Sequence, residues 1–394
     1  MANGFTRFLG ERFIHFKKMV PLSITFFFYL FGWGLLAPIF NIRINEITGS
    51  LFLSGIVFSM VGFVRIFLDP SVGLLCDKFS PKKLLQIALL SYALIFFLYS
   101  VVNSFIELLI IRVFNGFAAA LLWICGWTLV RRKSKGRYAQ EELSAWVTIQ
   151  DIAYIFGPII GGFLITALSW KPVFYIASLI SLIAFVYASI SLENPELKHK
   201  PISLKKQFKS FFKNKSSSIR LVSITLLIAL VASAFAGFLP LRLDASGVSI
   251  EEISIILSIA VITPYLIFPV IIGVLSDRYG RKIPTIIGLL CCFYGLFMFS
   301  NLNSFAQFFF YTFVIYTGFA FISMSVNAEL NDLLHIEEVG GFTGIFEMIK
   351  DVGNSFGPII FGLIASFSGM GLAFMILSLI SISSIVVLKG FKDF

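Results

Sequence analysis

Charged side chains are scarce in this chain. They make up 13% of its 394 residues, whereas about 25% is usual for a soluble domain. Hydrophobic residues make up 58%, and the mean hydropathy is +0.93. A chain with so few polar groups cannot cover an apolar interior with a hydrated surface. The composition therefore excludes an ordinary soluble domain and indicates a membrane protein.

Histidine and cysteine are also scarce, which limits the chemistry that the chain can carry out. The three histidines fall in segments expected to lie outside the membrane: His15, His199 and His335. The four cysteines show no metal-ligand or disulfide-framework spacing: Cys76, Cys125, Cys291 and Cys292. No nucleophile, metal or phosphate-binding motif appears. We expect neither an enzyme nor a resident cofactor, metal ion or disulfide.

Uncharged runs long enough to cross a bilayer recur along nearly the whole chain. A span needs about 20 apolar residues in a helix. We expect twelve spans: 19–41, 52–75, 84–102, 104–130, 142–167, 171–191, 220–240, 252–275, 283–300, 304–328, 342–366 and 371–388. The first run is too long for the apolar region of a signal peptide, so we interpret it as a retained helix.

The net charge of +10 is explained by the membrane orientation of the chain, so it does not require a nucleic-acid partner. Lys and Arg accumulate in cytoplasmic loops of membrane proteins. If the N-terminus is cytoplasmic, 25 of the 31 lie inside and three lie outside: Arg43, Lys171 and Arg242. An even number of spans then returns the C-terminus to the cytoplasm. We expect a multi-pass protein of the cell membrane with both termini cytoplasmic.

The chain contains an internal repeat at an offset of 200 residues. Two separate stretches share this offset, which favours duplication of a six-helix unit over composition bias. The first stretch pairs Gly73, Leu75, Asp77 and Lys82 with Gly273, Leu275, Asp277 and Lys282. The second pairs Asp151, Phe156, Gly157, Pro158, Ile159, Ile160 and Gly162 with Asp351, Phe356, Gly357, Pro358, Ile359, Ile360 and Gly362.

The repeat divides the chain into two six-helix bundles of like orientation. We expect an all-α membrane protein with an N-terminal bundle over 1–191, a cytoplasmic linker over 192–219 and a C-terminal bundle over 220–394. Two parallel halves with a substrate site between them are one known plan of transporters. The linker is rich in lysine, which suits either a solvated loop or contact with anionic lipid headgroups.

Loops that follow the second and eighth spans resemble the loop motif of the major facilitator superfamily. They read Gly73-Leu-Leu-Cys-Asp77-Lys and Gly273-Val-Leu-Ser-Asp277-Arg278-Tyr-Gly280-Arg281-Lys. The resemblance implies that the two aspartates pair with nearby cations and a helix end, and so latch the outward-open state. The first copy departs from the family pattern at Ser80 and Pro81.

Two further motifs resemble those of the drug and proton antiporters within this family. Arg112-Val-Phe-Asn-Gly116 resembles a motif whose arginine is associated with proton coupling, and Trp123 would share its helix face. Gly157-Pro158-Ile-Ile-Gly161-Gly162 resembles the Gly-Pro motif associated with export. Small residues allow close helix approach and proline bends a helix, so the motif also suits a hinge. Gly and Pro are common in membrane helices generally, and the eleventh span repeats the motif, so it does not require antiport.

Ionisable residues at membrane depth are candidates for function, because their burial is costly. They are Arg65, Asp69, Arg112, Asp151, Glu347, Lys350 and Asp351. Arg65 with Asp69, and Lys350 with Glu347, have the helical spacing of local ion pairs. Asp151 and Asp351 lack such partners and share a helix face with the prolines seven residues later. Our hypothesis is that Asp151, Asp351 and Arg112 couple transport to protons, with Arg65, Asp69 and Glu347 in reserve.

A small solute is the expected cargo, but the sequence does not identify it. Aromatic side chains suit a hydrophobic substrate cavity, although packing accounts for most of them. The candidates for the cavity, with Lys350, are Tyr29, Trp33, Trp123, Trp127, Tyr154 and Tyr265; Tyr311 and Tyr316 belong to the same class. We expect a monomer that exports a drug-like or amphipathic compound in exchange for protons. Import of a sugar or organic anion, or flipping of a lipid or glycolipid, is the alternative.

Overall fold

The computed structural model describes residues 2–133, 139–193, 215–333 and 339–390, and every regular element in these ranges is helical. The N-terminal half comprises α1 (Ala2–Thr48), α2 (Leu51–Lys78), α3 (Pro81–Tyr99), α4 (Phe105–Lys133), α5 (Ala139–Leu168) and α6 (Trp170–Ser191). The C-terminal half comprises α8 (Lys215–Asp244), α9 (Ile250–Ile255), the π-helix η1 (Ile256–Ala260), α10 (Val261–Ile267), α11 (Pro269–Tyr279), α12 (Lys282–Phe299), α13 (Phe305–Leu333), α14 (Val339–Ser383) and the 3₁₀ segment η2 (Ser384–Gly390).

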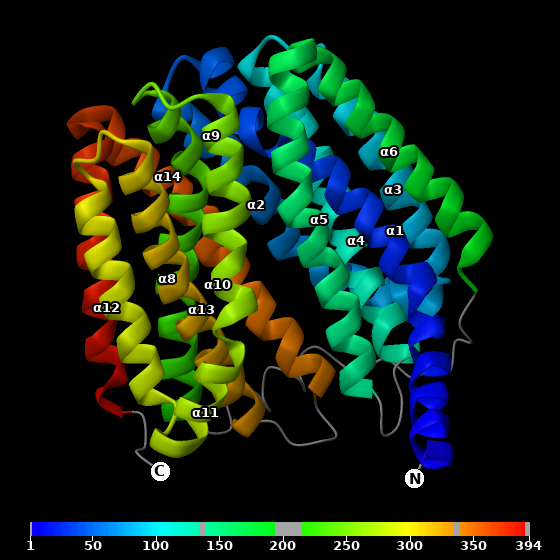
Figure 1. The fold of residues 1–394 in the computed structure, drawn as a ribbon. Coiled ribbons are helices and arrows are strands. Elements are labelled where there is room, and N and C mark those ends of the chain that lie inside the picture. Colours follow the sequence, from blue (N-terminus) through cyan, green and yellow to red (C-terminus); the bar gives the residue numbers. More distant parts are fainter. Residues whose placement is uncertain (1, 134–138, 194–214, 334–338, 391–394) are drawn as a thin grey trace.

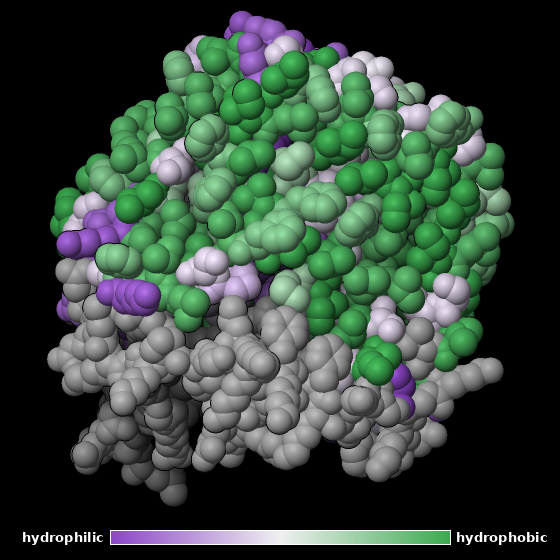
Figure 2. Space-filling view, turned by 180° about the vertical axis from the view of Figure 1, so that it is seen from behind, coloured by the Kyte–Doolittle hydropathy of each residue, from purple (hydrophilic) through white to green (hydrophobic). Residues whose placement is uncertain are grey.

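Eleven stretches within the described ranges are long and apolar enough to cross a membrane. One of them, Phe346–Val386, contains two of the expected spans, because α14 turns at Gly369, where φ is 81°. Glycine adopts this left-handed conformation without the steric penalty of a Cβ atom. The twelve expected crossings therefore agree with the structure. Figure 2 shows the broad apolar surface that these helices present.

The eighth crossing is broken, although the sequence predicts one continuous helix over 252–275. It consists of α9, η1, α10 and α11, and it is interrupted at Phe268. Pro264 and Pro269 explain part of the break, because proline lacks the backbone donor that continues a helix. The π-helical turn adds a second irregularity. The equivalent α2 is continuous through Pro70.

Several predicted features lie partly or wholly outside the residues that the structure describes. The first helix begins at Ala2 rather than at residue 19, and nothing is described of its side chains before Met19. Residues 194–214, which form most of the predicted linker and carry His199, lie outside the described residues, as does His335. The side chain of Asp77 does so too.

The two halves meet closely at one end of the molecule and spread apart at the other. Figure 1 shows that α1 begins, and η2 ends, at the end where the helices diverge. The contacts join α2 to α14 and α1 to α8 in the opposite part of the bundle. Asn41 Nδ2 donates to the Gly237 carbonyl at 2.9 Å, and the Phe52 amide donates to Ser366 Oγ at 3.1 Å. We call the end with the chain termini the terminal end and the other the closed end.

Candidate functional site

Arg65 of α2 binds two carboxylates, one from each half of the molecule. Its Nη2 donates to Asp69 Oδ2 at 2.9 Å and lies 3.2 Å from Asp351 Oδ2 of α14. The predicted pair of Arg65 and Asp69 is thus confirmed. The side chains of Asp69 and Asp351 are 8% and 3% exposed. Such burial is tolerated because opposite charges and hydrogen bonds replace hydration. We call these three residues the ion triad.

The ion triad stands at the inner limit of a row of contacts between α2 and α14. The row begins near the closed end and reaches Arg65, halfway along α2. Its members are Phe52 with Ser366, Gly55 with Pro358, Gly62 with Ser355, Phe63 with Phe356 and Arg65 with Asp351. The triad is thus placed to respond when the two helices separate.

A second pair of charges lies one turn from Asp351, toward the terminal end. Lys350 Nζ donates to Glu347 Oε2 at 3.4 Å, which confirms the pair predicted from helical spacing. Both side chains are nearly half exposed. Asp351 interacts electrostatically with both of them, as well as with Arg65 and Asp69 of the ion triad. Two cations and three carboxylates therefore gather here, with a net charge of −1 when all are ionised.

Asp151, the repeat equivalent of Asp351, stands alone. It is half-buried on α5, and within the described ranges it forms no ion pair or hydrogen bond. Its charge is felt by Tyr154, one turn further along α5. The residue at the repeat position of Arg65 is Tyr265, which supplies no cation. The two equivalent carboxylates therefore occupy different electrostatic environments.

Arg112 joins α4 to α2 instead of pairing with an acid. Its Nε donates to the Val57 carbonyl at 2.8 Å and its Nη2 to the Phe58 carbonyl at 3.2 Å. Its guanidinium lies over the Phe40 ring, 5.3 Å from the centroid. Phe58 packs in turn on Phe238 of the other half. This arginine positions the part of α2 that faces the C-terminal half.

The structure does not gather Asp151, Asp351 and Arg112 into one group. Asp351 lies between the halves, Arg112 binds carbonyl groups of α2, and Asp151 lies on α5. The sequence did not reveal that Arg65 reaches Asp351, because helical spacing reports neighbours on one helix only. Local pairing left Asp151, Asp351 and Arg112 without partners, which pointed to Arg112 rather than to Arg65 as the partner of Asp351.

The Gly-Pro motifs bring backbones together at equivalent places in the two halves. A Cβ at Gly157 would lie 2.8 Å from the Gly34 Cα, and one at Gly357 would lie 2.2 Å from the Leu230 carbonyl oxygen. Further along each helix the contact is with the other half. A Cβ at Gly162 would meet Ser254 of α9, and one at Gly362 would meet Leu51 of α2. The motifs thus hold α5 and α14 against both halves.

The second loop motif forms a local ion pair. Arg281 Nη1 donates to Asp277 Oδ1 and to Ser276 Oγ, at 2.8 and 2.7 Å. Gly280 has φ 78° and ends α11, whereas Ser80 has φ −61° and precedes α3. The first copy therefore makes its turn without a left-handed residue, which explains why glycine is absent there. Arg278 lies over the Tyr279 ring, and a Cβ at Gly73 or Gly273 would meet nothing.

We expect Asp277→Asn to lower the free energy of unfolding by less than about 1 kcal/mol. The Asp277 side chain is 77% exposed, and exposed ion pairs contribute little because water screens them. Thermal unfolding followed by tryptophan fluorescence measures the effect. A decrease of several kcal/mol in the free energy of unfolding would contradict this, because it would show that the ion pair stabilises the fold much more than an exposed pair can.

Most of the aromatic candidates for a substrate cavity pack against other rings. Tyr29 packs on Tyr92 with centroids 4.6 Å apart, and Trp127 packs on Trp146 at 4.7 Å. Trp33 contacts Phe40 and Phe96, Trp123 contacts Phe26, and Tyr154 and Tyr265 pack against the core. Tyr316 contacts Phe235, and Tyr311 contacts Tyr294. Ring packing therefore accounts for the placement of most of these side chains, and their part in a substrate cavity stays a prediction.

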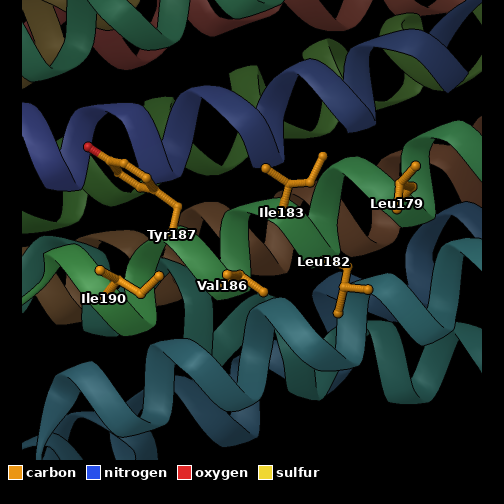
Figure 3. Close-up of a pocket in the computed structure, with 6 residues that line it drawn as sticks. All are labelled: Leu179, Leu182, Ile183, Val186, Tyr187 and Ile190. Carbon is orange, nitrogen blue, oxygen red and sulfur yellow. The ribbon is translucent and has the colours of Figure 1, made fainter.

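A shallow apolar groove runs along α6, on the outside of the N-terminal half. Figure 3 shows its lining side chains, all from α6: Leu179, Leu182, Ile183, Val186, Tyr187 and Ile190. Five of the six are at least 40% exposed, as expected of a surface that faces lipid chains. The groove contains no charged group, so it does not share the chemistry of the ion triad.

Comparison with known proteins places the chain in one family. A family model described as Major Facilitator Superfamily matches residues 22–241 and 221–392. The chain is 26% identical over 371 residues to Multidrug resistance protein 1 of Bacillus subtilis (strain 168), which covers 88% of this chain and 90% of that protein. It is 24% identical over 351 residues to Quinolone resistance protein NorA of Staphylococcus aureus (strain MSSA476), with 88% and 89% covered.

Solved structures share the fold. The nucleoside transporter NupG superposes with a TM-score of 0.80 at 17% identity, over 95% of this chain and 99% of that one. An inward-facing bacterial homologue of the human lysosomal transporter Spinster superposes with a TM-score of 0.74 at 13% identity, over 95% and 94%. These likenesses support a two-bundle fold of twelve helices and say nothing about the cargo.

Proposed function

Because the chain belongs to the major facilitator superfamily, and so is a multi-pass membrane transporter rather than an enzyme, we propose that it exports a drug-like or amphipathic compound in exchange for protons. The names of the relatives in Bacillus subtilis and Staphylococcus aureus support export of such compounds. The observation that carries proton coupling is the Arg65–Asp351 contact, a buried ion pair between the two halves. Such a pair links a proton site to the movement of the halves.

The orientation follows from the basic residues. With 25 of the 31 Lys and Arg on the side of the chain termini, the terminal end faces the cytoplasm. The structure then has its halves joined on the outer side and spread on the cytoplasmic side, as in an inward-facing transporter. The N-terminal bundle (1–191) and the C-terminal bundle (220–394) would rock against each other to open the outer side.

Opening of the outer side changes the partners of Asp351. Arg65 and Asp69 stand on the same helix, so they stay paired when α2 moves away from α14. Asp351 then loses its ion pair with Arg65 while it remains at membrane depth, and the nearest remaining cation is the half-exposed Lys350 of its own helix. A buried carboxylate without a cation favours its neutral form. In the outward-facing state Asp351 therefore binds a proton. In the inward-facing state Asp351 releases that proton and pairs with Arg65 instead.

This exchange gives coupling its direction. The proton enters from the outer side, where Asp351 becomes available, and leaves to the cytoplasm when Arg65 returns. The charged group around Asp351 carries a net −1 when ionised, from Arg65 and Lys350 against Asp69, Glu347 and Asp351. One proton makes it neutral, which lowers the cost of keeping the group away from water. We assign Asp151 the role of a second proton-binding carboxylate, since among the residues that the structure describes no cation pairs with it.

Transport by purified protein in proteoliposomes tests this proposal. A quinolone, norfloxacin, serves as the drug-like probe, and uridine represents the nucleosides. With an acidic lumen, outward movement of protons should drive uptake of norfloxacin and should not drive uptake of uridine. Dissipating the gradient with an ionophore should stop the uptake.

Two results would contradict the proposal in different ways. Uptake of norfloxacin that ignores the pH gradient would exclude proton exchange. Uptake of uridine alone would exclude drug-like cargo while leaving proton coupling open. Glu347→Gln is the comparison variant for Asp351, because it removes one charge from the same group but leaves the ion pair between Arg65 and Asp351 in place.

A further inference from the structure

Two buried thiols face each other near the terminal end of the N-terminal half. Cys76, in the last turns of α2, has its Sγ 3.1 Å from the Sγ of Cys125 on α4. The two side chains are 1% and 0% exposed. Both residues are reduced in the structure. They are 49 positions apart in the chain, so helix packing rather than sequence proximity brings them together.

Small side chains also occupy the two equivalent positions in the other half. At the offset of 200 residues, Cys76 corresponds to Ser276 and Cys125 to Ser325. Both serines are buried, with exposures of 4% and 1%. The duplicated fold therefore accommodates a small side chain at both positions, and only the N-terminal half has thiols there. Serine is accordingly the substitution that disturbs the packing least.

We propose that Cys76 and Cys125 are an oxidation site that forms a disulfide between α2 and α4. The oxidant is a membrane-permeable two-electron acceptor such as a diazene, a quinone or a peroxide. Each thiol loses its proton, one S–S bond forms, and the oxidant takes up two electrons and two protons. With diamide, the N=N double bond becomes an N–N single bond that carries two hydrogens. The approach of the two sulfur atoms supplies the geometry, since disulfide formation needs little backbone movement when the side chains already meet.

The disulfide would fasten α2 to α4 at a second level. Arg112 already ties α4 to the carbonyl groups of Val57 and Phe58, which lie several helical turns before Cys76 on α2. Both helices belong to the N-terminal half, which moves as one body in the proposed cycle. The oxidised protein should therefore keep its transport activity. This inference does not depend on the identity of the cargo.

Counting thiols tests the site directly. Full-length protein in vesicles is treated with diamide, denatured, labelled with a maleimide and weighed by mass spectrometry. The reduced protein should carry four labels and the oxidised protein two. Peptide mapping of the wild type should find Cys76 linked to Cys125, which requires no variant. Cys76→Ser and Cys125→Ser should each abolish the link, and the double variant Cys291→Ser, Cys292→Ser should keep it.

Three results would overturn the proposal. Four labels after diamide treatment would show that the two sulfur atoms do not join. A link that persists in Cys76→Ser would assign oxidation to another pair. A peptide that joins Cys76 or Cys125 to one of the α12 cysteines would show that these helices do not pack as the structure has them.

Discussion

Asp351→Asn is expected to reduce proton-driven transport by about 5- to 150-fold, the range that corresponds to coupling free energies of about 1–3 kcal/mol. Asparagine has nearly the shape of aspartic acid but cannot exchange a proton or form an ion pair with Arg65. Both the proton site and the bridge between the halves are lost. Exchange of labelled for unlabelled substrate without a gradient should continue, because it requires movement of the halves but no net proton transfer.

Parallel measurements of gradient-driven uptake and of exchange separate this expectation from simple misfolding. A misfolded variant would lose both activities. Glu347→Gln should keep exchange and should lose less gradient-driven uptake than Asp351→Asn, because it removes one charge from the group around Asp351 but leaves the ion pair between Arg65 and Asp351 intact. Full gradient-driven uptake by Asp351→Asn would remove Asp351 from the coupling mechanism and leave Asp151 as the candidate.

Gly55→Val is expected to abolish turnover, because its side chain would prevent closure at the outer side. A Cβ at this position would lie 2.3 Å from the Pro358 carbonyl oxygen of the other half. This neighbour is backbone, so relief requires α2 and α14 to move apart. Closing that contact is a step in every cycle of the proposed mechanism, which predicts loss of exchange as well as of gradient-driven uptake.

Ala236→Val is the matched control for this prediction. Ala236 is exposed on α8, so the two methyl groups that valine adds there point to the outside of the bundle rather than into the contact between the halves. Normal exchange by Gly55→Val would show that the close contact between Gly55 and Pro358 is not needed for transport.

The number and order of the helices could be predicted because a bilayer imposes a simple rule on sequence. Apolar runs of span length and the offset of 200 residues were sufficient to place the crossings and the two halves. The break at Phe268 and the π-helix from Ile256 were missed. Apolar content does not distinguish a straight helix from an interrupted one, and Pro70 shows that proline alone does not decide the matter.

The candidate site could be predicted only in part. Pairs within one helix followed from spacing, as Arg65 with Asp69 shows. The bridge from Arg65 to Asp351 could not follow, because it depends on which face of α14 meets α2. The repeat also concealed it: Asp151 and Asp351 look equivalent in sequence, yet Tyr265 stands where a second arginine would be needed.

The most direct test of the central claim is the distance between the outer ends of the two halves. Asn103 and Asn303 are exposed, repeat-equivalent positions at the closed end, one in each half. Spin labels at these positions, in a background with serine in place of the four native cysteines, report this distance by electron–electron resonance. If Arg65 and Asp351 hold the outer side closed, Asp351→Asn should shift the distribution to longer distances at neutral pH, and acidification should shift the otherwise unmodified protein the same way. Distributions that are identical with and without the Asp351 carboxylate, at every pH, would contradict the account.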